Sequence, residues 1–253
     1  MKFGFCIGGD ANKISLAEKA GADYVETAFD MLARDDGTGY DAFAAELKKC
    51  SIPCESANCF IPGSLKVTGP DVDYDALRRY VGRGMERGAA IGLKTVIFGS
   101  GGARSVPEGW SFAEAFRQLA RFLKEVAGPL AAQNGIRIAV EPLCDCNIIN
   151  TGKEGVMLAA AADLPNVGGL VDLYHVYQIG ERVSNIRDLK GNLFHSHIAE
   201  PTKRVFPADP AEYDYKSFVD ALEYAECPRC SVEAGNKDFA SDAIRAMRVL
   251  KNL

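Results

Sequence analysis

The feature that most constrains this chain is a regular alternation of short apolar runs with longer segments of helical periodicity. The short runs are rich in β-branched or apolar residues and form eight strand candidates: Lys2–Ile7, Asp23–Glu26, Pro53–Ala57, Thr95–Phe98, Arg137–Glu141, Gly169–Asp172, Leu193–Ile198 and Cys230–Glu233. Apolar residues at helical spacing mark the segments between them, most clearly Tyr74–Ile91, Phe112–Gln133, Glu154–Ala162, Tyr215–Ala225 and Asp238–Leu250. Strict alternation of strands and helices is typical of a parallel sheet with right-handed crossovers.

Eight such units favour an α/β fold closed into a (β/α)8 TIM barrel, which about 250 residues commonly form as one domain. A six-stranded open sheet with extra elements is the alternative. Three helix-to-strand junctions place a glycine, at Gly21, Gly92 and Gly135, where the helix should end. Glycine tolerates the left-handed conformation that stops a helix. No linker or change of composition divides the chain, so we expect a single domain over residues 1–253.

Composition and charge argue against several classes of protein. The net charge is −5 and the isoelectric point is near 5.4, whereas nucleic-acid-binding surfaces are usually basic. The N-terminus lacks the long apolar stretch of a signal peptide, and no apolar run approaches the length of a membrane span. We therefore expect a cytoplasmic protein with neither nucleic acid nor membrane as a partner.

The eight cysteines do not indicate a disulfide scaffold, which belongs to short secreted domains. Cys227 and Cys230 have the spacing of a redox pair or of half a zinc site. A redox pair normally begins a helix, whose dipole lowers the thiol pKa. Because this pair leads into a strand candidate and no second pair completes a zinc site, we interpret it as structural.

The last four strand candidates each end in, or carry near the end, an ionisable residue: Glu141, Asp172, His197 and Glu233. In a barrel these C-terminal ends meet at one face, where active sites lie. Any one of these residues alone is more often a hydrogen-bonded structural residue than a ligand, but four at equivalent positions favour a site. Buried carboxylates need compensation, and a divalent cation provides it. Three carboxylates and one imidazole suit Mn2+, Mg2+ or Co2+ better than a thiolate-type zinc site, although Zn2+ stays open.

Two further residues are candidates for substrate contact from their strands. Glu26 ends the second strand candidate, where we expect it either to face the substrate or to form a structural ion pair. His195 lies two residues before His197 and therefore points to the same side of its strand. We expect His195 to contact the substrate or to support the site from behind.

Two long loops are expected to cover the C-terminal face and shape the pocket. They are Asn58–Asp73, after the third strand candidate, and Gly99–Gly109, after the fourth. The second begins with a glycine-rich turn that leads to Arg104. Exposed backbone amides beside a guanidinium suit an anion or a phosphate, and a solvated loop is the alternative.

The C-terminal half of the chain resembles a known family in its motifs. These are Glu141-Pro-Leu, Asn150-Thr, Val171-Asp-Leu-Tyr-His, His195-Ser-His-Ile-Ala-Glu and Val232-Glu-Ala-Gly. They are similar to those of the xylose-isomerase-like TIM barrels, often described as sugar phosphate isomerases or epimerases. That superfamily includes ketose 3-epimerases, hydroxypyruvate isomerases and inosose-processing enzymes. The resemblance covers the whole chain, with its specific motifs between residues 141 and 235.

The resemblance implies a metal-dependent enzyme acting on a small sugar or keto-sugar. In the family the residues that match Glu141, Asp172, His197 and Glu233 bind the metal, most often Mn2+, and the residue that matches His175 contacts the substrate. The metal stabilises an enediolate as a Lewis acid. Glutamates at the positions of Glu141 and Glu233 act as base and acid, so that either epimerisation or aldose–ketose isomerisation follows.

The sequence departs from the ketose 3-epimerase pattern in the substrate pocket. Asn147 stands where those enzymes carry a second glutamate, and Lys203-Arg204 occupy the region where the family often has one arginine. Asn147 and Arg204 are therefore candidate substrate contacts in a pocket that differs from that of the 3-epimerases. Family members are often dimers or tetramers, which leaves a homo-oligomer open.

Three other functions compete with an isomerase. Related barrels with similar metal sites are lyases that dehydrate keto-acids or keto-cyclitols. A nuclease resembling endonuclease IV is disfavoured, because three histidines are too few for a trinuclear zinc cluster and the chain is acidic. A non-catalytic binding barrel is disfavoured by the presence of both candidate acid–base glutamates.

Overall fold

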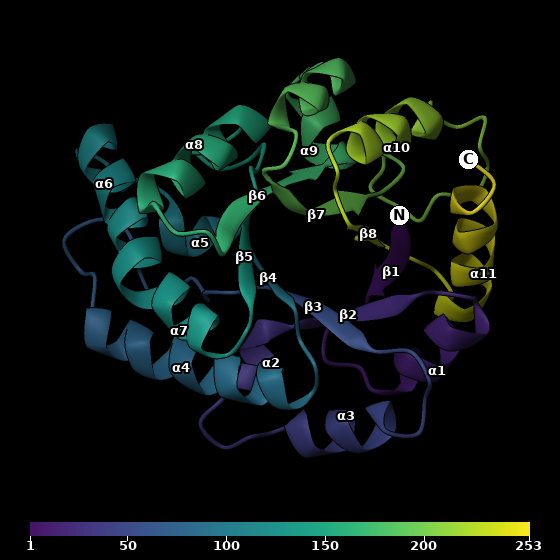
Figure 1. Cartoon of the computed structure of the whole chain (residues 1–253), viewed down its shortest axis with the longest axis horizontal. Coiled ribbons are helices and arrows are strands. Elements are labelled where there is room, and N and C mark those ends of the chain that lie inside the picture. The colour runs from purple at the N-terminus through teal and green to yellow at the C-terminus, as the bar shows by residue number, and fades with distance from the viewer.

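Each strand hydrogen-bonds to its neighbours in sequence, and the last strand pairs with the first to close a parallel barrel (Figure 1). This computed structural model describes all residues, 1–253. The strands are β1 (Lys2–Cys6), β2 (Tyr24–Ala28), β3 (Cys54–Asn58), β4 (Thr95–Phe98), β5 (Arg137–Val140), β6 (Val167–Asp172), β7 (Leu193–Ile198) and β8 (Arg229–Val232). The predicted (β/α)8 barrel is confirmed, and the open-sheet alternative is wrong.

Helices surround the barrel on its outside (Figure 1). They are α1 (Asn12–Lys19), α2 (Phe29–Ala33), α3 (Tyr40–Leu47), α4 (Tyr74–Ala90), α5 (Gly101–Arg104), α6 (Phe112–Phe122), α7 (Gly128–Gln133), α8 (Gly152–Ala162), α9 (Leu173–Gln178), α10 (Tyr215–Tyr224) and α11 (Phe239–Leu250), with a π-helical turn η1 (Leu123–Ala127) and a 3-10 helix η2 (Val183–Leu189). No helix combines the length and the apolar character needed to cross a membrane.

Most predicted boundaries agree with the structure within two residues, and the differences have local causes. The glycines expected to end three helices, Gly21, Gly92 and Gly135, all have positive φ. β6 begins at Val167, two residues before the predicted start at Gly169, because the glycines at 168 and 169 have low β propensity. At Gly168 a Cβ would lie 2.8 Å from the Phe194 ring of β7, so the close approach of the two strands requires glycine.

The segment 112–133, expected as one helix, is continuous but contains the turn η1 between α6 and α7. Pro129 follows this turn in the first turn of α7. Proline has no N–H to donate and crowds the preceding turn of a regular helix. A π-turn accommodates this by inserting one residue into the helix.

The strands present apolar residues to the helices and mainly polar residues to the barrel interior. A core of 65 buried residues fills the space around the strands. Ile97, Ala139 and Leu170, from β4, β5 and β6, form a separate apolar cluster. They alternate with residues of the main core, so they point inward. The remaining interior is polar and leads up to the C-terminal mouth.

The cysteines show no sign of redox chemistry. All eight are free thiols. Cys227 and Cys230 are buried, and burial raises the pKa of both thiols, that of Cys227 to about 11. This agrees with the structural interpretation of the pair.

Two glycines of α4 allow a matched test of the packing between α4 and α2. A Cβ at Gly84 would lie 2.3 Å from the Phe29 ring, whereas the nearest atom to a Cβ at Gly82 is 4.0 Å away. We expect Gly84→Ala to destabilise the protein by about 1–3 kcal/mol through overpacking. Gly82→Ala should stabilise it by roughly 0.5–1 kcal/mol, because alanine favours the helix. Urea unfolding measures both changes, and equal effects would contradict the packing argument.

Candidate active site

Four side chains predicted as metal ligands converge at the C-terminal mouth of the barrel. Glu141 follows β5, Asp172 ends β6, His197 lies in β7 and Glu233 follows β8. One potential ligand atom from each lies within 4.8 Å of all the others. The strand register explains the meeting, since Asp172 pairs with His197, and His197 pairs with Ser231, two residues before Glu233.

The imidazole of His197 has a defined orientation. Its Nδ1 lies 2.9 Å from Glu141 Oε1 and 3.5 Å from Glu233 Oε2, and its Nε2 lies 2.9 Å from Glu26 Oε1. Nδ1 therefore faces the cluster, and Nε2 is directed to the carboxylate behind it. A histidine that donates its second ring N–H to a carboxylate is the usual arrangement at metal sites, because the carboxylate fixes the tautomer and the ring.

Glu26 lies beneath the cluster and not in the substrate cavity. Its second oxygen, Oε2, accepts hydrogen bonds of 2.7 Å from Ser56, Ser231 and His195. Glu26 and His195 are both fully buried. The predicted strand ended at Glu26, but β2 continues to Ala28, which places Glu26 deeper in the barrel. Of the two alternatives for each residue, substrate contact is therefore not supported: Glu26 is ion-paired with His197 from behind, and His195 supports Glu26.

The acidic residues of the cluster have divergent proton affinities. Burial and repulsion from Glu233 raise the pKa of Asp172 to about 7. Burial, with repulsion from Glu233, also raises the pKa of Glu141 despite the nearby His197. Burial acts in the same direction on Glu233, but the charges of His197 and Arg204 outweigh it and lower its pKa.

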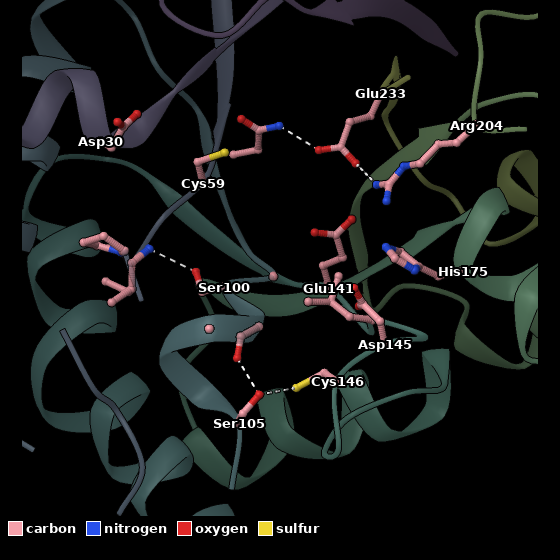
Figure 2. Close-up of a pocket in the computed structure, with 17 residues that line it drawn as sticks. Asp30, Cys59, Ser100, Ser105, Glu141, Asp145, Cys146, His175, Arg204 and Glu233 are labelled. Carbon is pink, nitrogen blue, oxygen red and sulfur yellow. Dashed lines mark hydrogen bonds and ion pairs between the residues drawn. The ribbon is translucent and has the colours of Figure 1, made fainter. Parts of the chain in front are cut away.

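Arg204 supplies positive charge at the edge of the cluster. One guanidinium nitrogen lies 2.6 Å from Glu233 Oε2 and 3.5 Å from Asp172 Oδ2, as Figure 2 shows for Glu233. The guanidinium also lies 4.6 Å from the centre of the Tyr174 ring. Arg204 has a φ of 51°, a left-handed conformation that costs a non-glycine residue about 1 kcal/mol or more. Arg204 lines the cavity described below, and its contact with a substrate stays a prediction.

His175 lines the cavity and has one ring nitrogen that makes no hydrogen bond. The backbone N–H of Cys144 donates to His175 Nδ1 over 3.1 Å, so in the neutral ring the proton is on Nε2. Nε2 is buried without a hydrogen-bond partner and lies 3.7 Å from Asp172 Oδ2. Burial, together with the charge of Arg204, lowers the pKa of His175 to about 4. His175 is therefore a neutral hydrogen-bond donor, in the place predicted for a substrate contact.

A cavity of about 620 Å³ opens above the cluster. Both predicted loops contribute to it, and Figure 2 shows Asp30 and Cys59 across the cavity from Arg204 and His175. Its wall consists of Asp30, Asn58, Cys59, Ile61, Pro62, Gly99, Ser100, Gly101, Gly102, Ser105, Glu141, Leu143, Asp145, Cys146, His175, Arg204 and Glu233. This size suits a sugar-sized ligand with room to spare.

Two predicted substrate contacts do not line the cavity. Arg104 is fully buried, and its guanidinium donates to the carbonyls of Phe98 and Ile149 at 2.9 and 3.2 Å. It therefore joins the end of β4 to the loop after β5, and the structure does not support its predicted contact with an anion in the cavity. The side-chain amide of Asn147 pairs with the backbone N–H and carbonyl of Val106, both at 2.9 Å, so it fixes the loop after β4.

Sequence reasoning missed Asn58 and Gly99. Asn58 ends β3, and its Nδ2 donates to Glu233 Oε1 over 2.7 Å. Extending the strand-end rule to the first four strands would have found it. A Cβ at Gly99 would lie 2.4 Å from Glu141 Oε2, so the absence of a side chain there makes room for the carboxylate. The sequence signal was a glycine directly after β4, which was interpreted as part of a turn.

The four converging residues fit a divalent cation. The buried carboxylates of Glu141 and Asp172 and the half-buried one of Glu233 share their surroundings with one imidazole and one guanidinium, and burial with repulsion from Glu233 raises the pKa of Asp172. Oxygen and imidazole ligands suit Mn2+, Mg2+, Co2+ or Zn2+. In this arrangement His197 would use Nδ1, and Glu26 would hold its other nitrogen.

Comparisons with known proteins agree with the fold. The sequence model described as "Xylose isomerase-like TIM barrel" matches residues 14–253. No curated protein is significantly similar in sequence. The solved structure of 3-keto-D-glucoside 4-epimerase from E. coli has a TM-score of 0.82 and 19% identity, over 100% of both chains.

Two other solved structures have the same fold. The D-allulose 3-epimerase from Methylomonas sp., in complex with D-allulose, has a TM-score of 0.82 and 19% identity over 100% of this chain and 96% of that chain. The IOLI protein with a bound zinc atom has a TM-score of 0.69 and 18% identity over 100% of this chain and 96% of that chain.

Replacing Gly99 should displace the Glu141 carboxylate without unfolding the barrel. The atom that a new Cβ would meet is the mobile end of Glu141. We expect Gly99→Ala to lower kcat by about 100-fold, as displacements near 1 Å at reacting groups do. Gly63→Ala is the control, since its Cβ would approach only the Gly102 backbone, at 3.7 Å. Equal kcat values for the two variants, with unchanged melting temperatures, would count against the tight fit around Glu141.

Removing the negative charge behind His197 should weaken metal binding. We expect Glu26→Gln to reduce the affinity for Mn2+ by about 10–100-fold, the usual effect of losing such a partner. Ser56→Ala removes a donor to the other oxygen of Glu26 and leaves the His197 contact in place, so it should change the affinity much less. Calorimetric titration of metal-free protein measures both, and an unchanged affinity in Glu26→Gln would exclude this role.

Proposed function

Since the chain belongs to the xylose isomerase-like TIM barrel family, we propose that it is a divalent-metal-dependent isomerase or epimerase of a sugar or keto-sugar. The observation that carries the proposal is the position of Glu141 and Glu233. Both carboxylates line the cavity, and both lie beside His197 Nδ1. Two carboxylates in one sugar-sized cavity can take a proton from a carbon beside a carbonyl and return it.

The metal would be held by Glu141, Asp172, His197 and Glu233. A bound divalent ion supplies Lewis-acid stabilisation of the negative charge that develops on the substrate oxygens, worth several kcal/mol. We propose Mn2+, with Mg2+, Co2+ and Zn2+ as alternatives. The chain's own part is to hold the carboxylates in place, through Asn58 and Arg204 at Glu233 and through the space left by Gly99 at Glu141.

The remaining polar groups of the wall would orient the substrate. His175 would donate its Nε2 proton to a carbonyl or hydroxyl oxygen, because that nitrogen makes no hydrogen bond within the protein and lies 3.7 Å from Asp172 Oδ2. One guanidinium nitrogen of Arg204, Nη2, donates to Glu233 and Asp172. The guanidinium has further N–H donors for hydroxyl groups of the substrate. Proton transfer between adjacent carbons would give an aldose–ketose isomer, and return to the same carbon from the other side would give an epimer.

Hydrogen exchange tests the proposed reaction. When a panel of keto-sugars is incubated with the Mn2+-loaded protein in D2O, the sugar that is the substrate should take up deuterium at carbon. Glu233→Gln should reduce the rate of this exchange by about 100-fold or more. Glu226→Gln is the control, because Glu226 pairs with Lys190 outside the site. Full turnover by Glu233→Gln would refute the mechanism. An unsaturated product formed with loss of water would instead identify a lyase of a keto-acid or keto-cyclitol.

Metal removal gives an independent test. Chelation should abolish exchange, and the return of Mn2+ should restore it, because the charge of Arg204, the one cationic residue of the cavity wall, is already paired with Glu233 and Asp172. Exchange that persists after complete chelation, as measured by elemental analysis of the same sample, would rule out metal dependence.

A further inference from the structure

The charge of the cavity wall is almost entirely negative. Asp30, Asp145, Glu141 and Glu233 contribute carboxylates, and Arg204 is the only lysine or arginine among the lining residues. Even with a divalent ion bound, the wall would retain excess negative charge.

The charge of Arg204, the one cationic residue of the wall, is already paired with carboxylates. Arg204 is ion-paired with Glu233 at 2.6 Å and with Asp172 at 3.5 Å. Turning it toward a phosphate would leave these carboxylates with less compensation, which is unfavourable for buried charges. Proteins that bind phosphoryl groups usually offer uncommitted arginine forks or lysines.

Other cations near the wall do not supply a phosphate site. Arg34 reaches Asp30 at 3.1 Å and Lys66 donates to the Gly102 carbonyl at 2.8 Å, both from outside the cavity. Arg104 is fully buried and bound to two carbonyls. The glycine-rich turn thus lacks the cation that a phosphate would need.

The same wall is well suited to hydroxyl groups. Carboxylates accept hydrogen bonds from hydroxyls, and serine hydroxyls donate or accept them. Asp30, Asp145, Ser100 and Ser105 line the cavity and provide such groups in addition to the ligand candidates (Figure 2). The buried, unpartnered Nε2 of His175 provides a donor for an uncharged oxygen.

We infer that this site accepts uncharged, unphosphorylated polyhydroxy substrates and excludes sugar phosphates, with Asp30 and Asp145 as the residues that repel the phosphate. This inference rests on the proposed function, because it concerns the same cavity. Repulsion between like charges, together with the lack of a free cation, gives the selectivity.

Binding of non-reacting probes tests the inference separately from turnover. A hexitol and its terminal phosphate lack a carbonyl, so neither can react. At fixed Mn2+ concentration, calorimetry should show the hexitol binding at least about 100-fold more tightly than its phosphate, in line with the several kcal/mol that like charges impose at a binding site.

Neutralising the two aspartates should relax the selectivity. In the variant Asp30→Asn with Asp145→Asn, we expect the preference for the hexitol to fall by at least about tenfold. Asp163→Asn is the control, because Asp163 ends α8 away from the cavity and lies 3.8 Å from Lys124. A preference unchanged in the double variant would show that other groups repel the phosphate and would overturn the assignment.

Two outcomes would overturn the inference as a whole: equal or tighter binding of the phosphate, and failure of both probes to bind. The proposed reaction fails differently. Absence of deuterium exchange with intact hexitol selectivity would refute the isomerase while leaving the substrate class in place.

Discussion

The contact between Glu26 and His197 is the interaction on which the rest of the site depends. A fully buried carboxylate is stable only when its oxygens are satisfied, and Glu26 meets this need with two imidazoles and two serine hydroxyls. Because those partners come from β3, β7 and β8, the carboxylate has little freedom to move. Its fixed position determines which nitrogen of His197 faces the three acidic ligand candidates.

Above this buried layer, the site is held by close fit and by strained backbone. Gly99 leaves the space that Glu141 fills. Cys59, Ser100 and Arg204, which line the cavity, all have positive φ although they are not glycine. Such conformations persist only where the surroundings enforce them, and they are frequent at functional sites. At the mouth of the barrel, strained backbone therefore reduces the stability of the fold and in return fixes the positions of residues that line the cavity.

The sequence predicted the barrel and the convergence of the four candidate ligands, because both follow from period and position along a strand. Alternation fixes which residues face inward, and the ends of parallel strands meet at one face. Depth was harder to predict. Glu26 faces inward as expected, but β2 continues through Thr27 and Ala28, so Glu26 lies two residues below the end of the strand and deeper in the barrel.

Side-chain direction in loops was the other limit. Arg104 and Asn147 are polar residues in loops beside the cavity, and the sequence contains no periodic signal for which way they point. The structure turns one inward to carbonyls at Phe98 and Ile149 and the other to the Val106 backbone. Both side chains hold the loops in place through hydrogen bonds to the backbone, and the loops form the cavity wall. We therefore expect any effect of these two residues on substrate binding to be indirect.

The distribution of these residues along the chain has a consequence for how such an enzyme can change. All four candidate ligands lie in the second half, from β5 onward, while the loops after β3 and β4 supply much of the opposite cavity wall. Mutations in those loops that spare Asn58 and Gly99 can therefore alter which molecule is recognised while the proton-transfer groups stay in place. Three residues of the first half position these ligand candidates, namely Glu26, Asn58 and Gly99, and of these Glu26 is the fully buried one that links the two halves. A family built in this way can diversify its substrates by exchanging N-terminal loops, provided that the buried carboxylate of the second strand is inherited with the C-terminal half.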